Sequence, residues 1–258
     1  MRGSIHINWR QDGPEDGPAL VLLHPLGSDL RVFDGLLPLL PDDMRIIRID
    51  MRGHGGSECP PPPYGMGTLI ADTEKVFAEL NLRDAVLLGV SIGGLIAQGL
   101  AFKRPELLRG LILSNTAPRI GIRTMWEKRI AEMQKADINQ YAKDTFERWF
   151  GPLARRKADI GAVEKIVLQQ RIEGIIGCAH AIAGTDFYTQ TATLNLPVMC
   201  VAGDIDGSTP PDMVREMAAL IEDARFELLR GAGHLPFVEK PDDYATLIRD
   251  FTRGLDVN

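Results

Sequence analysis

The chain has 258 residues, of which 45% are hydrophobic and 25% are charged, as expected for a globular protein with a substantial core. Its formal net charge of −6 gives no electrostatic support for binding nucleic acid or an anionic membrane. The three cysteines, Cys59, Cys178 and Cys200, are widely spaced and odd in number, which argues against a disulfide framework and against a metal site. With no signal-peptide pattern at the start and no run of 18 apolar residues, we expect a cytoplasmic protein.

Short apolar runs alternate with amphipathic segments, which is typical of a parallel sheet covered by helices on both faces. Strands are predicted at residues 20–23, 44–50, 85–88, 107–113, 198–201 and 224–229. Helices are predicted at residues 31–40, 67–80, 91–102, 211–220 and 241–253. The sequence therefore predicts an α/β fold.

Strand-like runs disappear between residues 118 and 193, where the sequence becomes charged and helical. We interpret this segment as a helical lid inserted between two parts of one core, residues 1–117 and 194–258. Since the insertion lies between two core strands, we expect it to cover the carboxyl end of the sheet.

A serine lies between a predicted strand and a predicted helix, in the segment Gly89-Val90-Ser91-Ile92-Gly93. Gly-x-Ser-x-Gly in this setting indicates a tight, strained turn that presents the hydroxyl at the end of the sheet. Taken alone, the segment also fits an ordinary turn with a capping serine. We predict that Ser91 is a nucleophile, and that it needs a base and an acid that orients the base.

The predicted base is His234, in the glycine-flanked loop that follows the last strand. The acid should follow a strand between the serine and this histidine in the chain. Asp204 and Asp206 both follow the strand at 198–201, and the fourth position of the Gly-x-x-Asp turn favours Asp206. Asp204 is then a solvated turn residue.

The other histidines considered are assigned supporting roles. His24 ends a buried strand and should shape the loop over the nucleophile, and His54 should brace a neighbouring loop. His180 lies in the lid, either hydrogen-bonded between helices or in contact with substrate.

Attack on a carbonyl would create an oxyanion, which backbone N–H groups stabilise. Ile92 should supply one such group, because it follows the nucleophile at a helix N-terminus. Leu26 should supply the second, since Gly27 beside it allows the backbone to turn inward.

These landmarks, in this order, resemble the α/β-hydrolases over nearly the whole chain. They are the loop His24-Pro25-x-Gly27, the segment Asp50-x-Arg52-Gly53-His54-Gly55-x-Ser57, the serine turn, Gly203-x-x-Asp206, and Gly233-His234. The resemblance implies a mostly parallel sheet flanked by helices, a lid and a Ser-Asp-His triad, with neither metal nor organic cofactor.

Within that superfamily the chain is most similar to the 3-oxoadipate enol-lactonases. The similarity extends into the lid, at Arg119-Ile120-Gly121, Trp126-x-x-Arg129-Ile130, Glu147-Arg148-Trp149-Phe150, Cys178-x-x-Ala181-Ile182 and Asp186-Phe187. It implies hydrolysis of 3-oxoadipate enol-lactone to 3-oxoadipate in aromatic catabolism by the β-ketoadipate pathway. Pro25 departs from the asparagine found in many of these lactonases, although the proposed donor is the Leu26 backbone.

The only partner that we expect is a small, anionic lactone. Its binding site should combine aromatic walls with a cationic group that binds the carboxylate. Trp126 and Arg129 lie three residues apart on one predicted helix face, so both can turn toward the substrate. The alternative is that Trp126 packs in the lid and Arg129 is solvated. Arg148 is a further substrate-binding candidate, or part of an anchor between lid and core.

Two other enzymatic interpretations remain, a general carboxylesterase and a cofactor-free perhydrolase with the same triad. A haloalkane dehalogenase is disfavoured, because that branch needs an aspartate where Ser91 stands. A non-enzymatic receptor or scaffold is the alternative from another class of function. The sequence does not define the oligomeric state.

Overall fold

A computed structural model describes residues 5–151, 154–156 and 158–255 of the chain. Its centre is a seven-stranded sheet with the strand order β1-β3-β2-β4-β5-β6-β7. β1 runs antiparallel to β3, and every other neighbouring pair is parallel. The strands are β1 (Trp9–Asp12), β2 (Ala19–Leu23), β3 (Arg45–Ile49), β4 (Ala85–Val90), β5 (Leu108–Ser114), β6 (Val198–Gly203) and β7 (Arg225–Leu229).

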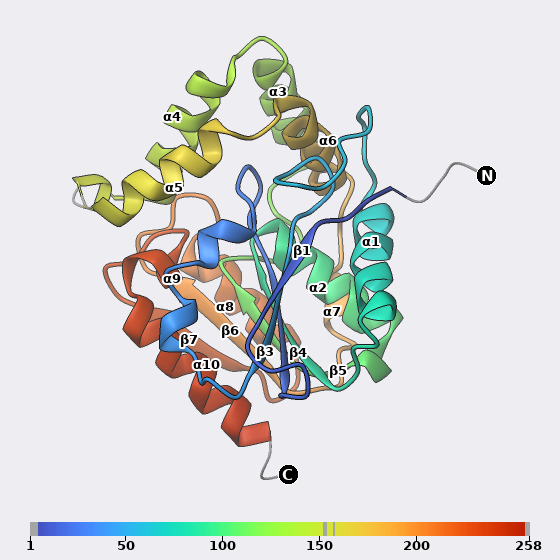
Figure 1. Cartoon of the computed structure of the whole chain (residues 1–258). Coiled ribbons are helices and arrows are strands. Elements are labelled where there is room, and N and C mark those ends of the chain that lie inside the picture. Colours follow the sequence, from blue (N-terminus) through green and yellow to red (C-terminus); the bar gives the residue numbers. More distant parts are fainter. Residues whose placement is uncertain (1–4, 152–153, 157, 256–258) are drawn as a thin grey trace.

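The central strands form the core of the molecule. Every residue of β2, β4 and β6 is buried, as expected for strands that are covered on both faces. The helices α1 (Met66–Glu79) and α2 (Ile92–Lys103) lie on one side of the sheet, and α10 (Pro241–Leu255) lies on the other (Figure 1). α8 (Pro211–Leu220) connects β6 to β7. The α/β fold, the six predicted strands and these four predicted helices are confirmed.

The helix predicted at residues 31–40 is wrong. Two short 3-10 helices, Leu30–Phe33 and Leu37–Leu39, occupy this region instead. Pro38 lacks the N–H group that a continuous helix would need at its position. In addition, buried Arg48 of β3 donates a hydrogen bond of 3.2 Å to the carbonyl of Leu30, a tertiary contact that no local pattern signals.

The strand β1 was not predicted. Its four residues contain one apolar side chain, Trp9, and none of them is fully buried. An edge strand with no buried face gives no alternating signal in the sequence.

Helices fill the chain between β5 and β6. They are α3 (Arg123–Met133), α4 (Ile138–Trp149), a short 3-10 helix (Ala154–Arg156), α5 (Ala158–Leu168), α6 (Ile172–Ala183) and α7 (Tyr188–Thr191). α3 to α6 gather at one end of the sheet, beyond the carboxyl ends of the parallel strands (Figure 1). α7 packs against α2 and α8 of the core. Among the described residues, no helix combines the length and the apolar character that crossing a membrane requires.

One glutamine ties this helical segment to the core. Gln170, buried after α5, donates to the carboxylate of Asp29 at 2.8 Å and accepts the N–H of Gly55 at 3.0 Å. Both partners lie on core loops at the carboxyl end of the sheet. Gln170 thus joins this helical segment, which we call the lid, to the core through one charge-assisted hydrogen bond and one to a backbone N–H.

Candidate active site

Ser91 lies in a strained turn between β4 and α2. Its backbone angles are φ 57° and ψ −117°, which a non-glycine residue rarely adopts. The glycines two positions away on each side permit the turn: a Cβ at Gly89 would lie 2.2 Å from the carbonyl oxygen of Gly93, and one at Gly93 would lie 2.4 Å from that of Leu23. The sequence pattern thus corresponds to a real steric requirement.

His234 and Asp206 are joined by a buried hydrogen bond. The distance from His234 Nδ1 to Asp206 Oδ2 is 2.8 Å. Burial alone would raise the pKa of the Asp206 carboxyl, but the charge and the hydrogen bond of His234 outweigh it, and this pKa lies below its ordinary value. A carboxylate held in this way fixes the ring orientation and leaves Nε2 as the nitrogen available to a hydroxyl.

Asp206 is held by a set of donors that the sequence did not reveal. Its Oδ1 accepts the backbone N–H groups of Ser208 and Thr209, at 2.7 and 3.1 Å, and its Oδ2 accepts the Thr209 hydroxyl at 2.8 Å. Asn115 Nδ2 donates to the same Oδ2 at 2.8 Å and to the carbonyl of Gly233 at 3.2 Å. Asn115 directly follows β5, which lies beside β6. A prediction of the strand order could therefore have placed Asn115 near Asp206.

Asp204, the other candidate acid, is exposed. Its carboxylate accepts the N–H of Gly231 at 2.6 Å, in the loop that leads to His234. It therefore lies at the surface and has no hydrogen bond to the imidazole.

Ser91 and His234 line the same small cavity. No hydrogen bond joins the hydroxyl to the imidazole among the residues described; in hydrolases this bond is often long until substrate is bound. Trp149 stacks on the imidazole of His234, with ring centroids 5.8 Å apart. The backbone N–H of His234 donates a hydrogen bond of 2.8 Å to the backbone carbonyl of Trp149. Trp149 is thus part of the site itself, a role that the sequence did not predict.

Hydrogen bonds within the loop after β2 fix the orientation of the Leu26 N–H group. The carbonyl of Pro25, which belongs to the same peptide group, contacts His24 Nδ1 at 2.9 Å and accepts the Ser28 hydroxyl at 3.0 Å. In a trans peptide the N–H points away from the carbonyl. The Leu26 N–H therefore points away from His24 and Ser28, which bind that carbonyl. Leu26 also lines the cavity at Ser91. The N–H of Ile92, the first residue of α2, is the neighbouring unpaired group expected at a helix N-terminus.

His24 and His54 both form hydrogen bonds with the loop after β2; this was predicted for His24, whereas His54 was expected to brace a neighbouring loop. His24 Nε2 accepts the N–H of Met51 at 3.0 Å, which leaves the ring proton on Nδ1 to donate to Pro25. His54 Nε2 accepts the N–H of Gly27 at 3.1 Å. Both rings are fully buried, and burial lowers the pKa of each, that of His54 to about 3.

The buried imidazole of His54 predicts an acid-sensitive fold. His54 stays neutral in the folded chain down to about pH 3, whereas the unfolded chain binds a proton near pH 6.5. The unfolded state therefore binds more protons between these values, and stability falls as the pH falls, by up to about 1.4 kcal/mol per pH unit from this group. Urea unfolding at several pH values across this window measures the slope.

The control for this prediction is His54→Gln, which removes the titrating group. We expect the variant to be less stable near neutral pH and to lose less stability on acidification than the wild type. Equal pH slopes for the two proteins would contradict the assignment of the acid sensitivity to His54.

The cavity at Ser91 is cationic on its lid side. It has a volume of about 40 Å³, and Arg129 and Arg148 both line it together with Trp126. The Arg129 guanidinium lies 4.5 Å from the centre of the Trp126 ring, while Trp126 Nε1 donates to the carbonyl of Ile120 at 2.5 Å. Of the described residues that line the cavity, none is an aspartate or a glutamate.

The two arginines oppose each other electrostatically. Burial and then the charge of Arg148 lower the pKa of the Arg129 guanidinium. Arg148 donates to the hydroxyl of Thr145 at 3.0 Å, and no salt bridge to either arginine occurs in the described ranges. Trp126 is buried in the lid and also lines the cavity, and its role in substrate binding stays a prediction. His180 of α6 is half-buried and does not line the cavity.

The class of protein follows from this framework. In this mostly parallel sheet, one strand leads through a strained serine into a helix, and a histidine lies on a later loop. This arrangement is typical of the α/β hydrolases. The chain belongs to the alpha/beta hydrolase family, whose sequence profile matches residues 20–247.

Relatives of this chain include lactonases and esterases. It is 30% identical to 3-oxoadipate enol-lactonase 2 of Acinetobacter baylyi, over 93% of this chain and 90% of that protein. It is 31% identical to a pimeloyl-[acyl-carrier protein] methyl ester esterase of Yersinia pseudotuberculosis, over 90% of this chain and 92% of the esterase. Among solved structures, the enol-lactonase of Burkholderia xenovorans superposes with a TM-score of 0.92 at 27% identity, covering 96% and 97% of the two chains.

Proposed function

We propose that this chain is a serine hydrolase that opens the ring ester of a small anionic lactone, 3-oxoadipate enol-lactone. The observation that carries the proposal is the composition of the cavity at Ser91. Two arginines without ion-pair partners among the described residues share it with the serine and His234, and no acidic side chain lines it. A substrate carboxylate between the two guanidinium groups would relieve their mutual repulsion and accept charge-assisted hydrogen bonds.

The proposed reaction begins with attack of Ser91 Oγ on the ring carbonyl carbon, while His234 Nε2 takes the hydroxyl proton. The N–H groups of Leu26 and Ile92 stabilise the oxyanion, each contributing about 3–4 kcal/mol to the lowering of the barrier. The ring C–O bond then breaks, and the leaving enol oxygen takes the proton from His234. An acyl-serine ester remains.

Water completes the proposed cycle. His234 removes a proton from water, which attacks the acyl-serine ester, and the released Ser91 oxygen takes that proton back. The enol tautomerises to the ketone, so the ring cannot readily close again. Asp206 orients the imidazole throughout and stabilises its positive charge.

Replacing Arg129 with methionine tests the substrate class. We expect the KM for 3-oxoadipate enol-lactone to rise about 10- to 100-fold, because a hydrogen bond to a charged group contributes roughly 1.5–3 kcal/mol. The kcat/KM for p-nitrophenyl acetate, which carries no carboxylate, should change less than about threefold. Arg148→Met should behave in the same way.

Arg119→Met is the matched control for this pair. Arg119 is an exposed lid arginine that pairs with Asp186 at 3.1 Å and does not line the cavity. Its replacement should leave both substrates unaffected. Equal losses on the lactone and the neutral ester in Arg129→Met would show that the arginine shapes the lid and does not bind a carboxylate.

A carboxylesterase acting on acyclic esters is the second candidate, favoured by the 31% identity to the methyl ester esterase. The two arginines that line the cavity at Ser91 favour the lactone, because they would bind its carboxylate, which a neutral acyclic ester lacks. Comparing kcat/KM for the enol-lactone with that for short p-nitrophenyl esters separates the candidates. We expect the lactone to be preferred by at least about 100-fold, equivalent to roughly 3 kcal/mol of transition-state binding.

A further inference from the structure

A second cavity, much larger than the one at Ser91, lies between the lid and the core. Its volume is about 500 Å³, within the range of sites for small organic ligands. None of its lining residues lines the cavity at Ser91. It is therefore a separate candidate site, to which the proposed reaction assigns no role.

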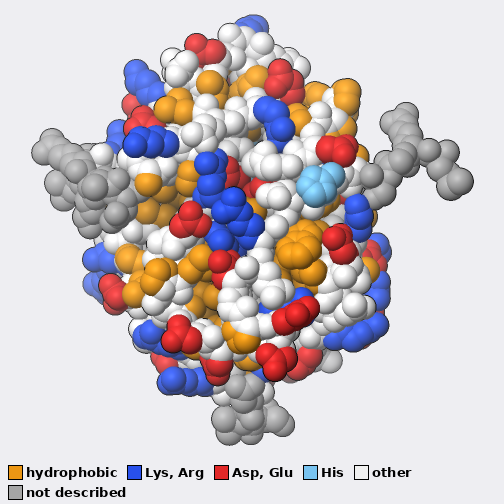
Figure 2. Space-filling model, viewed as in Figure 1, with side chains coloured by type: hydrophobic (Ala, Val, Ile, Leu, Met, Phe, Trp, Pro, Cys, Tyr) orange, Lys and Arg blue, Asp and Glu red, His pale blue; other side chains and the backbone are white. Residues whose placement is uncertain are grey.

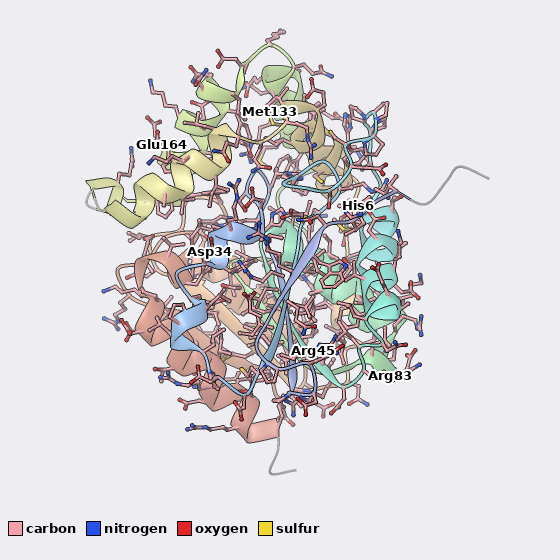
Figure 3. The ribbon with its side chains drawn as sticks, in the orientation of Figure 1. His6, Asp34, Arg45, Arg83, Met133 and Glu164 are labelled. Carbon is pink, nitrogen blue, oxygen red and sulfur yellow. The ribbon has the colours of Figure 1, made fainter. Side chains whose placement is uncertain are left out.

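The walls of this cavity are apolar and come from three segments. The core contributes Val32 and Leu36, and α9 (Pro236–Glu239) contributes Phe237. Across from them, α5 contributes Val163 and Ile166. In Figure 1, α5 lies above α9, and Figure 3 labels Asp34 on the core side and Glu164 on α5.

Three of the described residues that line this cavity carry a charge, and two of them already form salt bridges. Arg31 pairs with buried Asp29 at 2.7 Å. Asp34 pairs with buried Arg48 at 2.5 Å, and Arg48 also pairs with Asp12 at 2.9 Å. The third, Lys165 of α5, is exposed and has no ion-pair partner within the described ranges. Figure 2 shows hydrophobic side chains beside Lys and Arg on this face of the molecule. Of the described residues that line the cavity, Lys165 is thus the one cation without a salt bridge, and it lies beside apolar side chains.

We propose that this cavity binds a medium-chain fatty acid, with its alkyl chain against the apolar walls and its carboxylate beside Lys165. The ammonium group of Lys165 can pair with one carboxylate. A chain of about ten carbons fits within the volume and gains affinity from each methylene removed from water.

Gly35 provides a clean way to fill the cavity. It lines the cavity, and a Cβ added there meets no atom within 4 Å, so Gly35→Leu can place its side chain in open space. Gly67→Leu is the matched control, because a Cβ at this exposed glycine also meets no atom within 4 Å and Gly67 does not line the cavity. Val163→Trp fills the same cavity from the lid side.

The experiment is calorimetric titration of the full-length protein with decanoate. Saturable one-to-one binding is expected for the wild type and for Gly67→Leu, and binding at least about tenfold weaker for Gly35→Leu and Val163→Trp. Lys165→Gln should weaken decanoate binding about fivefold and leave the affinity for decan-1-ol unchanged. Ester hydrolysis by each variant confirms that it is folded.

Three results would overturn the proposal. The first is the absence of saturable decanoate binding below about 1 mM. The second is equal affinity of Gly35→Leu and Gly67→Leu, since the ligand would then bind elsewhere. The third is that Lys165→Gln weakens decanoate and decan-1-ol alike, because Lys165 would then shape the cavity and not bind the carboxylate.

Discussion

Ser91→Ala is expected to lower kcat for the enol-lactone by about 10⁴- to 10⁶-fold, because it removes the hydroxyl that we propose forms the acyl intermediate. The remaining rate would come from the oxyanion donors and from substrate binding. The fold should survive, since alanine at this position adds no atom and keeps the Cβ that the strained turn already accommodates.

Single-turnover kinetics and labelling with a fluorophosphonate measure this effect. The wild-type protein should be labelled at Ser91, and the variant should remain unlabelled with an unchanged circular dichroism spectrum. Retention of more than about 1% of the wild-type kcat would exclude a covalent role for the serine.

Asp206→Asn is expected to lower kcat by about 10⁴-fold, while KM changes little. The amide cannot stabilise an imidazolium, and it favours the tautomer in which the proton lies on the wrong ring nitrogen. Because interactions with His234 lower the pKa of Asp206, the wild-type carboxylate stays ionised well below neutral pH. The remaining activity of the Asp206→Asn variant should rise at high pH, because hydroxide can then replace the weakened base.

Asp204→Asn is the control for this variant. It makes the same chemical change two residues earlier, at an exposed carboxylate whose partner is the N–H of Gly231. Its expected loss of kcat is less than about threefold. A larger loss for Asp204→Asn than for Asp206→Asn would reverse the choice between the two candidate acids.

Sequence patterns predicted the structure best where steric requirements leave few alternatives. Gly89 and Gly93 flank Ser91 because a Cβ at either would collide with backbone, and this requirement is visible as a short motif. Buried parallel strands are visible as apolar runs for a similar reason, since both of their faces must be apolar. The predicted pairing of Asp206 with His234 followed from chain order and is present as a hydrogen bond of 2.8 Å, although their catalytic roles stay predictions.

Several contacts that the sequence did not predict join segments that are distant in the chain. The region 31–40 contains Pro38, and Arg48 of β3 also donates to the carbonyl of Leu30 just before it. Asn115 reaches Asp206 only because β5 lies beside β6. Trp149 stacks on His234 because the lid folds back over the sheet.

The sequence by itself determined the α/β fold, the strained serine turn and the candidates for nucleophile, base and acid. These features depend on sterics and hydrophobicity within a few residues of one another, which a linear pattern records. Only the tertiary structure decided which donors hold Asp206, that Arg129 and Arg148 face one cavity, and that a second cavity opens under α5. Those arrangements join segments that are distant in the chain, so their energies depend on packing and burial that no local stretch of sequence specifies.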